Sequence, residues 1–458
     1  MHLSRGNFNL RRTRRNNPTR MAVYIVVIMG CLYLLSQVRN EAIQPLFVPT
    51  ATATRSPTAY GEQAQAQFSA GQLKAAIDSY NSALELEPTR ADYWIQLARI
   101  QVYASQAEEG VESARNALLI DPENSTAHAV HALALDWTEK YDEAADAAVR
   151  AIQLDPNNAL AHAYYSEILV DTQRYAQARD EAKAALQIDP NSMDAYRAWG
   201  FYLESTGNYE EAIQAYQSAI KINPNLPFLF MKVGVLFRRL QQYDTSIEYF
   251  RRASSLDTDD IGPYLSISRT YFQMGEYGRS SQYLESALEI EPTNATVHGQ
   301  LGQVYFKALN YENAILELGC AVDGCQWQDG VVLNVNTTLA NLGCQANGKC
   351  NSLISDNTKP AYTVEPISLN ESTLEIYYTY SSVLAALTDV AKQKPYCQRA
   401  RPLFAQLRQY VQQSNLEGNA FVFDIVQENE NICAIAESLA LGTPLPANTA
   451  ASTETPGP

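Results

Sequence analysis

The chain has 458 residues, 46% of them hydrophobic and 18% charged, so it is long enough for two or three average domains or one long repeat array and apolar enough to bury a core. Its formal net charge is −16. Residues 1–40 carry seven arginines and no acidic residue, so the remaining 27 basic and 50 acidic residues give the rest of the chain a charge of −23. A body this acidic excludes a nucleic-acid-binding role, which needs basic density to displace counterions from phosphates.

An uncharged, largely apolar segment, residues 21–38, follows the N-terminal arginines. As a helix it would be about 27 Å long, close to the hydrocarbon thickness of a bilayer. Because the arginines lie mostly on its N-terminal side, the positive-inside rule predicts a single-pass membrane protein: a basic cytoplasmic segment (1–20), a transmembrane helix (21–38), a spacer (39–56) and an extracytoplasmic body. A cleaved signal peptide, a bacterial lipoprotein signal and a buried core helix are the alternatives.

A 34-residue repeat dominates the middle of the chain. Prolines recur at this spacing or twice it, at Pro88, Pro122, Pro156, Pro190, Pro224 and Pro292. Counted in eight repeats from residue 57, the eighth and twentieth positions hold only Ala, Gly or Ser, and the twenty-seventh is always Ala. Small residues let two antiparallel helices approach closely, and each proline ends a helix because the residue before it is pushed out of helical geometry.

This pattern resembles the tetratricopeptide repeat (TPR) family over residues 57–326, about 59% of the chain. The resemblance implies an all-α fold, a TPR α-solenoid of about eight to nine helix-turn-helix repeats that binds proteins on its concave face. Carried onto this sequence, the positions that line this face in the family predict a peptide-binding groove of Arg99, Trp137, Arg197, Phe201, Phe228, Met231, Arg238, Arg269, Phe272 and Phe306.

Arginine and aromatic side chains suit a protein partner that presents an acidic peptide segment, since arginine binds carboxylates in a bidentate manner. The alternative interpretation is that these arginines pair with neighbouring acidic residues such as Glu204, and that the phenylalanines belong to the core between repeats.

The periodicity stops after Ala321. Residues 327–371 are predicted to be a Cys-rich irregular insertion, with two short β-like runs at 331–335 and 361–368. Residues 372–441 are predicted to be a degenerate repeat with a capping helix, which the exposed apolar end of a solenoid needs. Residues 442–458 lack apolar periodicity and are predicted to be a disordered tail.

Six of the seven cysteines lie in the last third of the chain: Cys320, Cys325, Cys344, Cys350, Cys397 and Cys433. An even number of cysteines in a region expected outside the membrane indicates disulfides. We predict that the first four pair among themselves and that Cys397 pairs with Cys433. A zinc site is the alternative, although spacings of five and six residues miss the usual zinc-knuckle pattern.

No sequence motif indicates catalysis or a cofactor, and we predict neither. His128, His131 and His162 could be metal ligands on adjacent helices, but two of them occupy a packing position of the repeat, so we interpret them as packing residues and predict no metal site. We predict a membrane-anchored scaffold for protein–protein interaction in the assembly or organisation of an envelope or surface complex. The alternatives are a self-assembling subunit of an oligomer or filament, and a TPR-regulated enzyme such as a glycosyltransferase.

Overall fold

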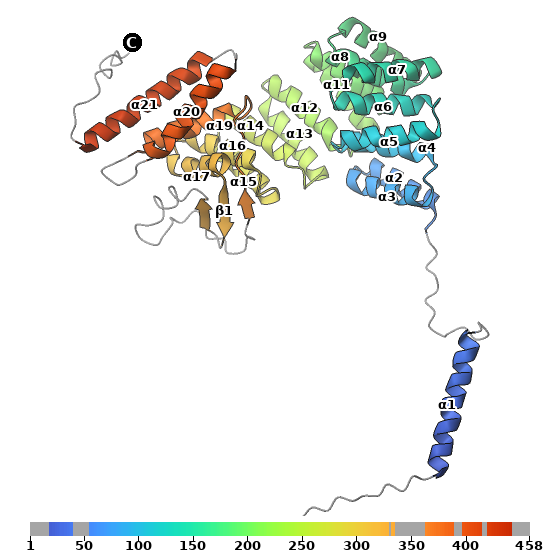
Figure 1. The fold of residues 1–458 in the computed structure, drawn as a ribbon. Coiled ribbons are helices and arrows are strands. Elements are labelled where there is room, and N and C mark those ends of the chain that lie inside the picture. The colour runs from blue at the N-terminus through green and yellow to red at the C-terminus, as the bar shows by residue number, and fades with distance from the viewer. Residues whose placement is uncertain are drawn as a thin grey trace, which may run out of the picture. The chain divides into compact units, whose positions relative to one another are not determined.

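The computed structural model describes residues 18–39, 55–328, 331–334, 362–388, 396–414 and 419–441. The chain divides into two compact units, Met1–Ser56 and Pro57–Pro458. In the first unit the described residues include one helix, α1 (Pro18–Arg39) (Figure 1). The repeats and the C-terminal region belong to the second unit.

Helix α1 corrects the prediction of a transmembrane segment. Within the described ranges, no helix combines the length and the apolar character that a membrane span requires. The predictions of a transmembrane helix over residues 21–38, of a cytoplasmic segment before it and of a single-pass membrane protein are therefore overturned.

Residues 57–323 form eight consecutive pairs of antiparallel helices (Figure 1), which confirms the predicted all-α solenoid. The pairs are α2 (Pro57–Ser69) with α3 (Leu73–Leu86), α4 (Ala91–Tyr103) with α5 (Ala107–Ile120), α6 (Ser125–Trp137) with α7 (Tyr141–Leu154), α8 (Ala159–Asp171) with α9 (Tyr175–Ile188), α10 (Met193–Ser205) with α11 (Tyr209–Ile222), α12 (Pro227–Arg239) with α13 (Tyr243–Leu256), α14 (Gly262–Gln273) with α15 (Tyr277–Ile290), and α16 (Ala295–Lys307) with α17 (Tyr311–Asp323). We number these pairs repeats 1 to 8.

The small residues of the repeat lie where the two helices of a pair touch. Every alanine at the twenty-seventh position, from Ala83 to Ala321, is fully buried. At the eighth position, a Cβ added to Gly200 would lie 2.9 Å from the ring of Tyr216, and one added to Gly234 would lie 2.5 Å from the ring of Phe250. A methyl group does not fit at these distances, so the close approach of the helices explains the small residues.

The turn between the helices is the same in all eight repeats. The residue at the fifteenth position has a φ between +59° and +82° in each of them, namely Gly71, Ser105, Glu139, Gln173, Gly207, Gln241, Gly275 and Leu309. Five repeats therefore place a residue with a Cβ in the left-handed region, which costs about 1 kcal/mol relative to glycine. The turn itself tolerates a side chain.

In repeats 2, 3, 4 and 8 the side chain at the fourth position joins the helix pair to the preceding one. The indole nitrogen of Trp94 donates a hydrogen bond to the carbonyl oxygen of Pro88 at 2.9 Å. The Nε2 atoms of His128, His162 and His298 lie 3.0–3.1 Å from the corresponding proline carbonyls. These side chains thus satisfy a carbonyl group at a helix end, and in the described part of the chain no cluster of three or more His, Cys, Asp or Glu side chains could hold a metal ion.

After repeat 8 the chain forms a small antiparallel sheet with the strand order β2–β1–β3. The strands are β1 (Cys325–Gln328), β2 (Val331–Asn334) and β3 (Tyr362–Val364). Two of them lie within the β-like runs of the sequence. The third, β1, follows the last repeat directly and was not predicted.

Three helices complete the described structure: α19 (Leu374–Ala386), α20 (Cys397–Gln413) and α21 (Asn419–Leu441). Helix α19 packs against α16 and α17 and continues the array as the first helix of a ninth pair, while α21 packs against α19 and α20. Asp323 at the end of repeat 8 accepts hydrogen bonds from Tyr380 and Arg399, which fixes α19 and α20 to the last repeat.

Two disulfides tie this C-terminal region together. Cys397 pairs with Cys433, with a Cα–Cα distance of 5.6 Å, which confirms that prediction. Cys320 pairs with Cys325, which links α17 to β1 and agrees with pairing among the first four cysteines. Cys344, Cys350 and the predicted tail at 442–458 lie outside the described residues.

Candidate functional site

The structure divides the predicted groove residues between two places. One set, Arg99, Trp137, Arg197, Phe201 and Phe228, belongs to repeats 1 to 6. The other set, Arg238, Arg269, Phe272 and Phe306, lines a single groove formed by repeats 6 to 8 and helix α19. Met231 lies with neither set, because it packs against the buried cluster that contains Phe250 and Ile267.

Repeats 1 to 5 and helix α12 of repeat 6 close on themselves, and we call them the N-terminal ring (residues 57–239), except that Arg238 near the end of α12 lines the groove. The side-chain amide of Asn225, just before α12, donates a hydrogen bond to the carbonyl oxygen of Ser69 at 2.9 Å. Inside the ring, the Tyr103 side chain stacks between those of Phe68 and Phe228, with centroid distances of 6.4 and 5.1 Å. The first repeat thus contacts the sixth, and the first helices of the ring face one another.

Ion pairs occupy the interior of the N-terminal ring. Arg197 lies 2.7 Å from Glu167, with side chains only 7% and 4% exposed, and Asp194 lies 3.7 Å from Arg197 and 3.8 Å from Arg99. Tyr103 also donates a hydrogen bond to Asp194. Arg197 and Arg99 therefore have carboxylate partners within the protein, as the alternative interpretation expected, although the partners are Glu167 and Asp194.

The pKa values of the two arginines reflect these partners. Burial alone would lower the pKa of Arg197, but Glu167, Asp194 and two nearby tyrosines together outweigh that effect and the pKa is raised. For Arg99, Asp194 and three nearby tyrosines together outweigh burial, and the pKa is raised as well. Both guanidinium groups are thus charged and paired within the ring, and Arg99 and Asp194 also line a cavity of about 640 Å³.

The remaining predicted residues of the ring lie at its margins. Phe201 is half-buried, with the ammonium group of Lys232 5.1 Å from its ring centroid. Trp137, at the C-terminal end of α6, is 41% exposed. Neither residue lines the groove of repeats 6 to 8.

That groove, the C-terminal groove, has a volume of about 680 Å³. Repeat helices contribute Arg238, Leu265, Ser266, Ser268, Arg269, Phe272, Gln273, Ser280, Leu284, Thr296, Gln300, Gln303, Val304, Phe306 and Lys307, and the segment around α19 contributes Ser372, Glu375, Ile376 and Thr379. Most of these residues lie on α12, α14, α16 and α19, the first helices of successive pairs, which line the concave side of a solenoid.

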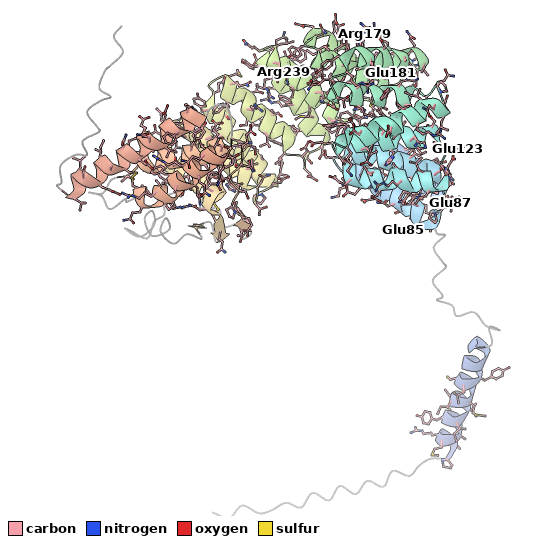
Figure 2. All side chains as sticks on the ribbon, turned by 45° about the horizontal axis from the view of Figure 1, so that its top comes forward. Glu85, Glu87, Glu123, Arg179, Glu181 and Arg239 are labelled. Atoms are coloured by element: carbon pink, nitrogen blue, oxygen red, sulfur yellow. A yellow bond between two sulfur atoms is a disulfide. The ribbon has the colours of Figure 1, made fainter. Side chains whose placement is uncertain are left out.

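The C-terminal groove is basic and its cations lack acidic partners. In the described part of the chain, no carboxylate oxygen lies within 4.0 Å of Arg238, Arg269 or Lys307. Arg238 donates a hydrogen bond of 3.3 Å to the carbonyl oxygen of Ser266. Its pKa is lowered, first by burial and then by the positive charges of Arg269 and Arg239, the last of which is labelled in Figure 2. The groove thus has an excess of positive charge that an anion would relieve.

Apolar side chains lie beside these cations. Phe272 packs edge-on against Tyr277 at 5.4 Å between centroids, and Phe306 packs against Tyr311 at 5.8 Å. Leu284 and Val304 are buried in the wall of the groove. The groove therefore offers both charge and apolar surface.

Sequence reasoning missed several residues of the C-terminal groove. Lys307 occupies the thirteenth position of repeat 8, a lining position of the family, so the repeat pattern could have identified it. Glu375 and Thr379 had no such signal, because an irregular insertion separates α19 from the periodic repeats.

Comparison with family models supports the repeat assignment. Models described as TPR repeat or tetratricopeptide repeat match residues 57–90, 138–199, 203–237, 229–260 and 261–294. No curated protein matches the sequence.

Among solved structures, a chain of the APC/C hetero-tetramer Cut9-Hcn1 is 17% identical, with a TM-score of 0.48. The match covers 59% of this protein and 53% of the Cut9-Hcn1 chain, so this protein spans about half the length of that chain. A tetratricopeptide repeat protein from Parabacteroides merdae is 16% identical, with a TM-score of 0.36 over 55% and 98% of the two chains. Pseudomonas aeruginosa pilF is 20% identical, with a TM-score of 0.37 over 42% and 88%. At these values the likeness says nothing about partners. Together with the helix pairs, the family models show tetratricopeptide repeats within residues 57–294.

Proposed function

We propose that this protein is a scaffold for protein–protein interaction and that its C-terminal groove binds an acidic peptide segment of the partner. Tetratricopeptide repeat arrays bind proteins along their concave surface. In this chain the N-terminal ring uses much of its concave surface for internal contacts, whereas the groove of repeats 6 to 8 and α19 is an open part of that surface.

One observation carries the proposal: three cations line an open groove and have no carboxylate partner among the residues that the structure describes. Arg238, Arg269 and Lys307 contribute three positive charges, whereas Glu375 is the one acidic residue among the residues that line the groove. Guanidinium groups bind carboxylates through paired hydrogen bonds, and the neighbouring Phe272 and Phe306 add apolar contact. A segment that combines carboxylates with an apolar side chain matches this surface.

The disulfides bear on where such a scaffold works. Cys320–Cys325 and Cys397–Cys433 fix the region that supplies α19 to the groove, and disulfides form and persist in oxidising compartments. We therefore place the proposed role in the organisation of a multi-protein complex in such a compartment, for example at a cell envelope or surface.

The test is selection from a random peptide display library on the immobilised full chain. We expect the selected peptides to be enriched in Asp and Glu around an apolar residue, and to bind the Arg238→Glu/Arg269→Glu variant at least about tenfold more weakly, because two favourable charge contacts become repulsive. The matched control is Arg150→Glu/Arg179→Glu, which changes the charge by the same amount on α7 and α9, outside the groove. Equal binding by the two variants would refute the groove as the binding surface.

A further inference from the structure

The contact that closes the N-terminal ring joins two turns that are 156 residues apart in sequence. Ser69 and Gly71 lie in the turn of repeat 1, and Asn225 lies in the loop between repeats 5 and 6. Besides the hydrogen bond from Asn225 to Ser69, the backbone of Asn225 lies directly against Gly71. A Cβ built on Gly71 would lie 1.9 Å from the Asn225 carbonyl oxygen. We call these interactions the closing contact.

Gly71 is set apart from the other turn glycines by this contact alone. Gly207 and Gly275 occupy the same fifteenth position with φ values of +82° and +76°, close to the +79° of Gly71. A Cβ on either of them would meet no atom within 4 Å. Other repeats carry Gln173 and Gln241 in this turn. The local conformation therefore tolerates glutamine, and the approach of Asn225 is what excludes a side chain at position 71.

The closing contact also holds the aromatic and charged groups inside the ring together. Phe68, near the end of α2, packs on Tyr103. The guanidinium carbon of Arg99 lies 5.2 Å from the ring centroid of Phe68. Phe228, which follows Asn225 by three residues, packs on Tyr103 from the other side. Separation of repeat 1 from repeat 6 would uncover the face of Tyr103, which is 5% exposed in the closed ring.

We propose that the closing contact is an autoinhibitory device: it holds repeats 1 to 6 in a closed ring and so withdraws the aromatic interior around Tyr103 from partners. With the contact released, the same repeats present Tyr103 and Phe228 on an open concave surface. This inference concerns the N-terminal ring and is independent of the ligand of the C-terminal groove.

The first test compares Gly71→Gln with Gly207→Gln in the full chain by amide hydrogen exchange. Both variants place glutamine in the same left-handed turn, so the strain of the turn is matched. We expect Gly71→Gln to accelerate exchange at residues 228–233 of the distant repeat 6 by about tenfold or more, and to increase the radius of gyration in X-ray scattering. Gly207→Gln should leave exchange at residues 228–233 unchanged. If both variants match the wild type there, the closing contact does not hold the ring.

The second test keeps repeat 1 intact, in case Gly71→Gln unfolds it. Asn225→Ala removes the hydrogen bond to Ser69 and should accelerate exchange at residues 70–73 about fivefold, as expected for one lost hydrogen bond. Its control is Asn191→Ala, at the same position of repeat 4. The backbone amide of Asn225 donates a hydrogen bond to the Asn223 side chain, and the backbone amide of Asn191 donates the equivalent bond to the Asp189 side chain. The Asn191 side chain is exposed. Wild-type exchange at residues 70–73 in Asn225→Ala would overturn the proposal.

Discussion

The N-terminal ring and the C-terminal groove are built from the same repeat and carry the same kinds of side chain. The pKa shifts of their arginines nevertheless have opposite directions. In the ring, Arg197 is buried against Glu167, and its pKa is raised because Glu167, Asp194 and nearby tyrosines together outweigh burial. In the groove, Arg238 has a carbonyl oxygen, the Phe250 ring and like charges around it, and its pKa is lowered. The comparison shows that an arginine at a lining position is a binding residue only where the array stays open.

The largest effect should follow from removal of Arg197. Arg197→Met leaves the buried Glu167 without its partner, and such a loss costs about 3–5 kcal/mol of unfolding free energy. Arg269→Met, in the groove, should change the stability by less than about 0.5 kcal/mol, because Arg269 is exposed. Urea unfolding followed by circular dichroism measures both values. Similar losses in the two variants would contradict the contrast between ring and groove.

Loss of the Cys397–Cys433 disulfide should be the next largest effect and should be confined to the groove side. The bond closes a loop of 36 residues, for which chain entropy gives about 2–4 kcal/mol. In Cys397→Ser/Cys433→Ser, hydrogen exchange in α19, α20 and α21 should accelerate, while the N-terminal ring keeps wild-type protection. Loosening of the ring to the same degree would show that the two regions are not independent.

Salt should affect the two regions differently, and we expect this difference to be smaller than the two effects above. Binding of a selected acidic peptide to the groove should weaken about tenfold between roughly 0.05 and 0.5 M sodium chloride, because exposed charges are screened. Hydrogen exchange of the ring should change little over the same range, since the Arg197–Glu167 pair is shielded from solvent. Fluorescence anisotropy of a labelled peptide measures the first quantity. A salt-independent affinity would contradict a charge-driven groove.

The smallest expected effect is a pH dependence shared by both regions. Nδ1 of His298 lies 2.6 Å from Glu317, and its Nε2 lies 3.1 Å from the Pro292 carbonyl, so both ring nitrogens face acceptors. Burial alone would lower the pKa of His298, but the hydrogen bond with Glu317, the charge of Glu317 and the Pro292 carbonyl together outweigh it and the pKa is raised. His162 has the same arrangement with Glu181, which Figure 2 labels on α9, and that hydrogen bond raises its pKa.

A histidine whose folded pKa is raised stabilises the fold fully below its usual value of 6.5, and this contribution is lost as the pH rises through the folded pKa. Glu317→Gln should therefore cost about 1 kcal/mol near pH 5.5 and clearly less near pH 8.5. Its control is Glu289→Gln on the exposed side of α15, which should show no such pH dependence. A cost that is equal at both pH values would show that His298 is uncharged.

The repeat pattern predicted the helix pairs well because its signals are local. The buried alanines at the twenty-seventh position, from Ala83 to Ala321, mark where the helices of each pair touch. Pairing of Cys397 with Cys433 also followed from the sequence. The transmembrane prediction was wrong, since an uncharged stretch and flanking arginines do not by themselves give a helix of sufficient length and apolar character in the described part of the chain.

The candidate site was predictable only in part. Arg238, Arg269, Phe272 and Phe306 came from the family's lining positions and lie together in the groove. Arg197 came from the same positions and lies in the interior of the ring. Its carboxylate partner is contributed by the neighbouring repeat, 30 residues away in sequence, and a position within one repeat carries no information about that neighbour.

By itself the sequence determined the unit of this protein: a 34-residue helix pair, its small-residue contacts and the number of copies. The tertiary structure alone decided where the array closes and where it stays open. Gly71, Gly207 and Gly275 are equivalent in the repeat pattern, yet only Gly71 meets another repeat. The physical reason is that closure depends on the small rotations between successive repeats, which accumulate over residues 57–239. A short stretch of sequence does not determine the total rotation over these repeats.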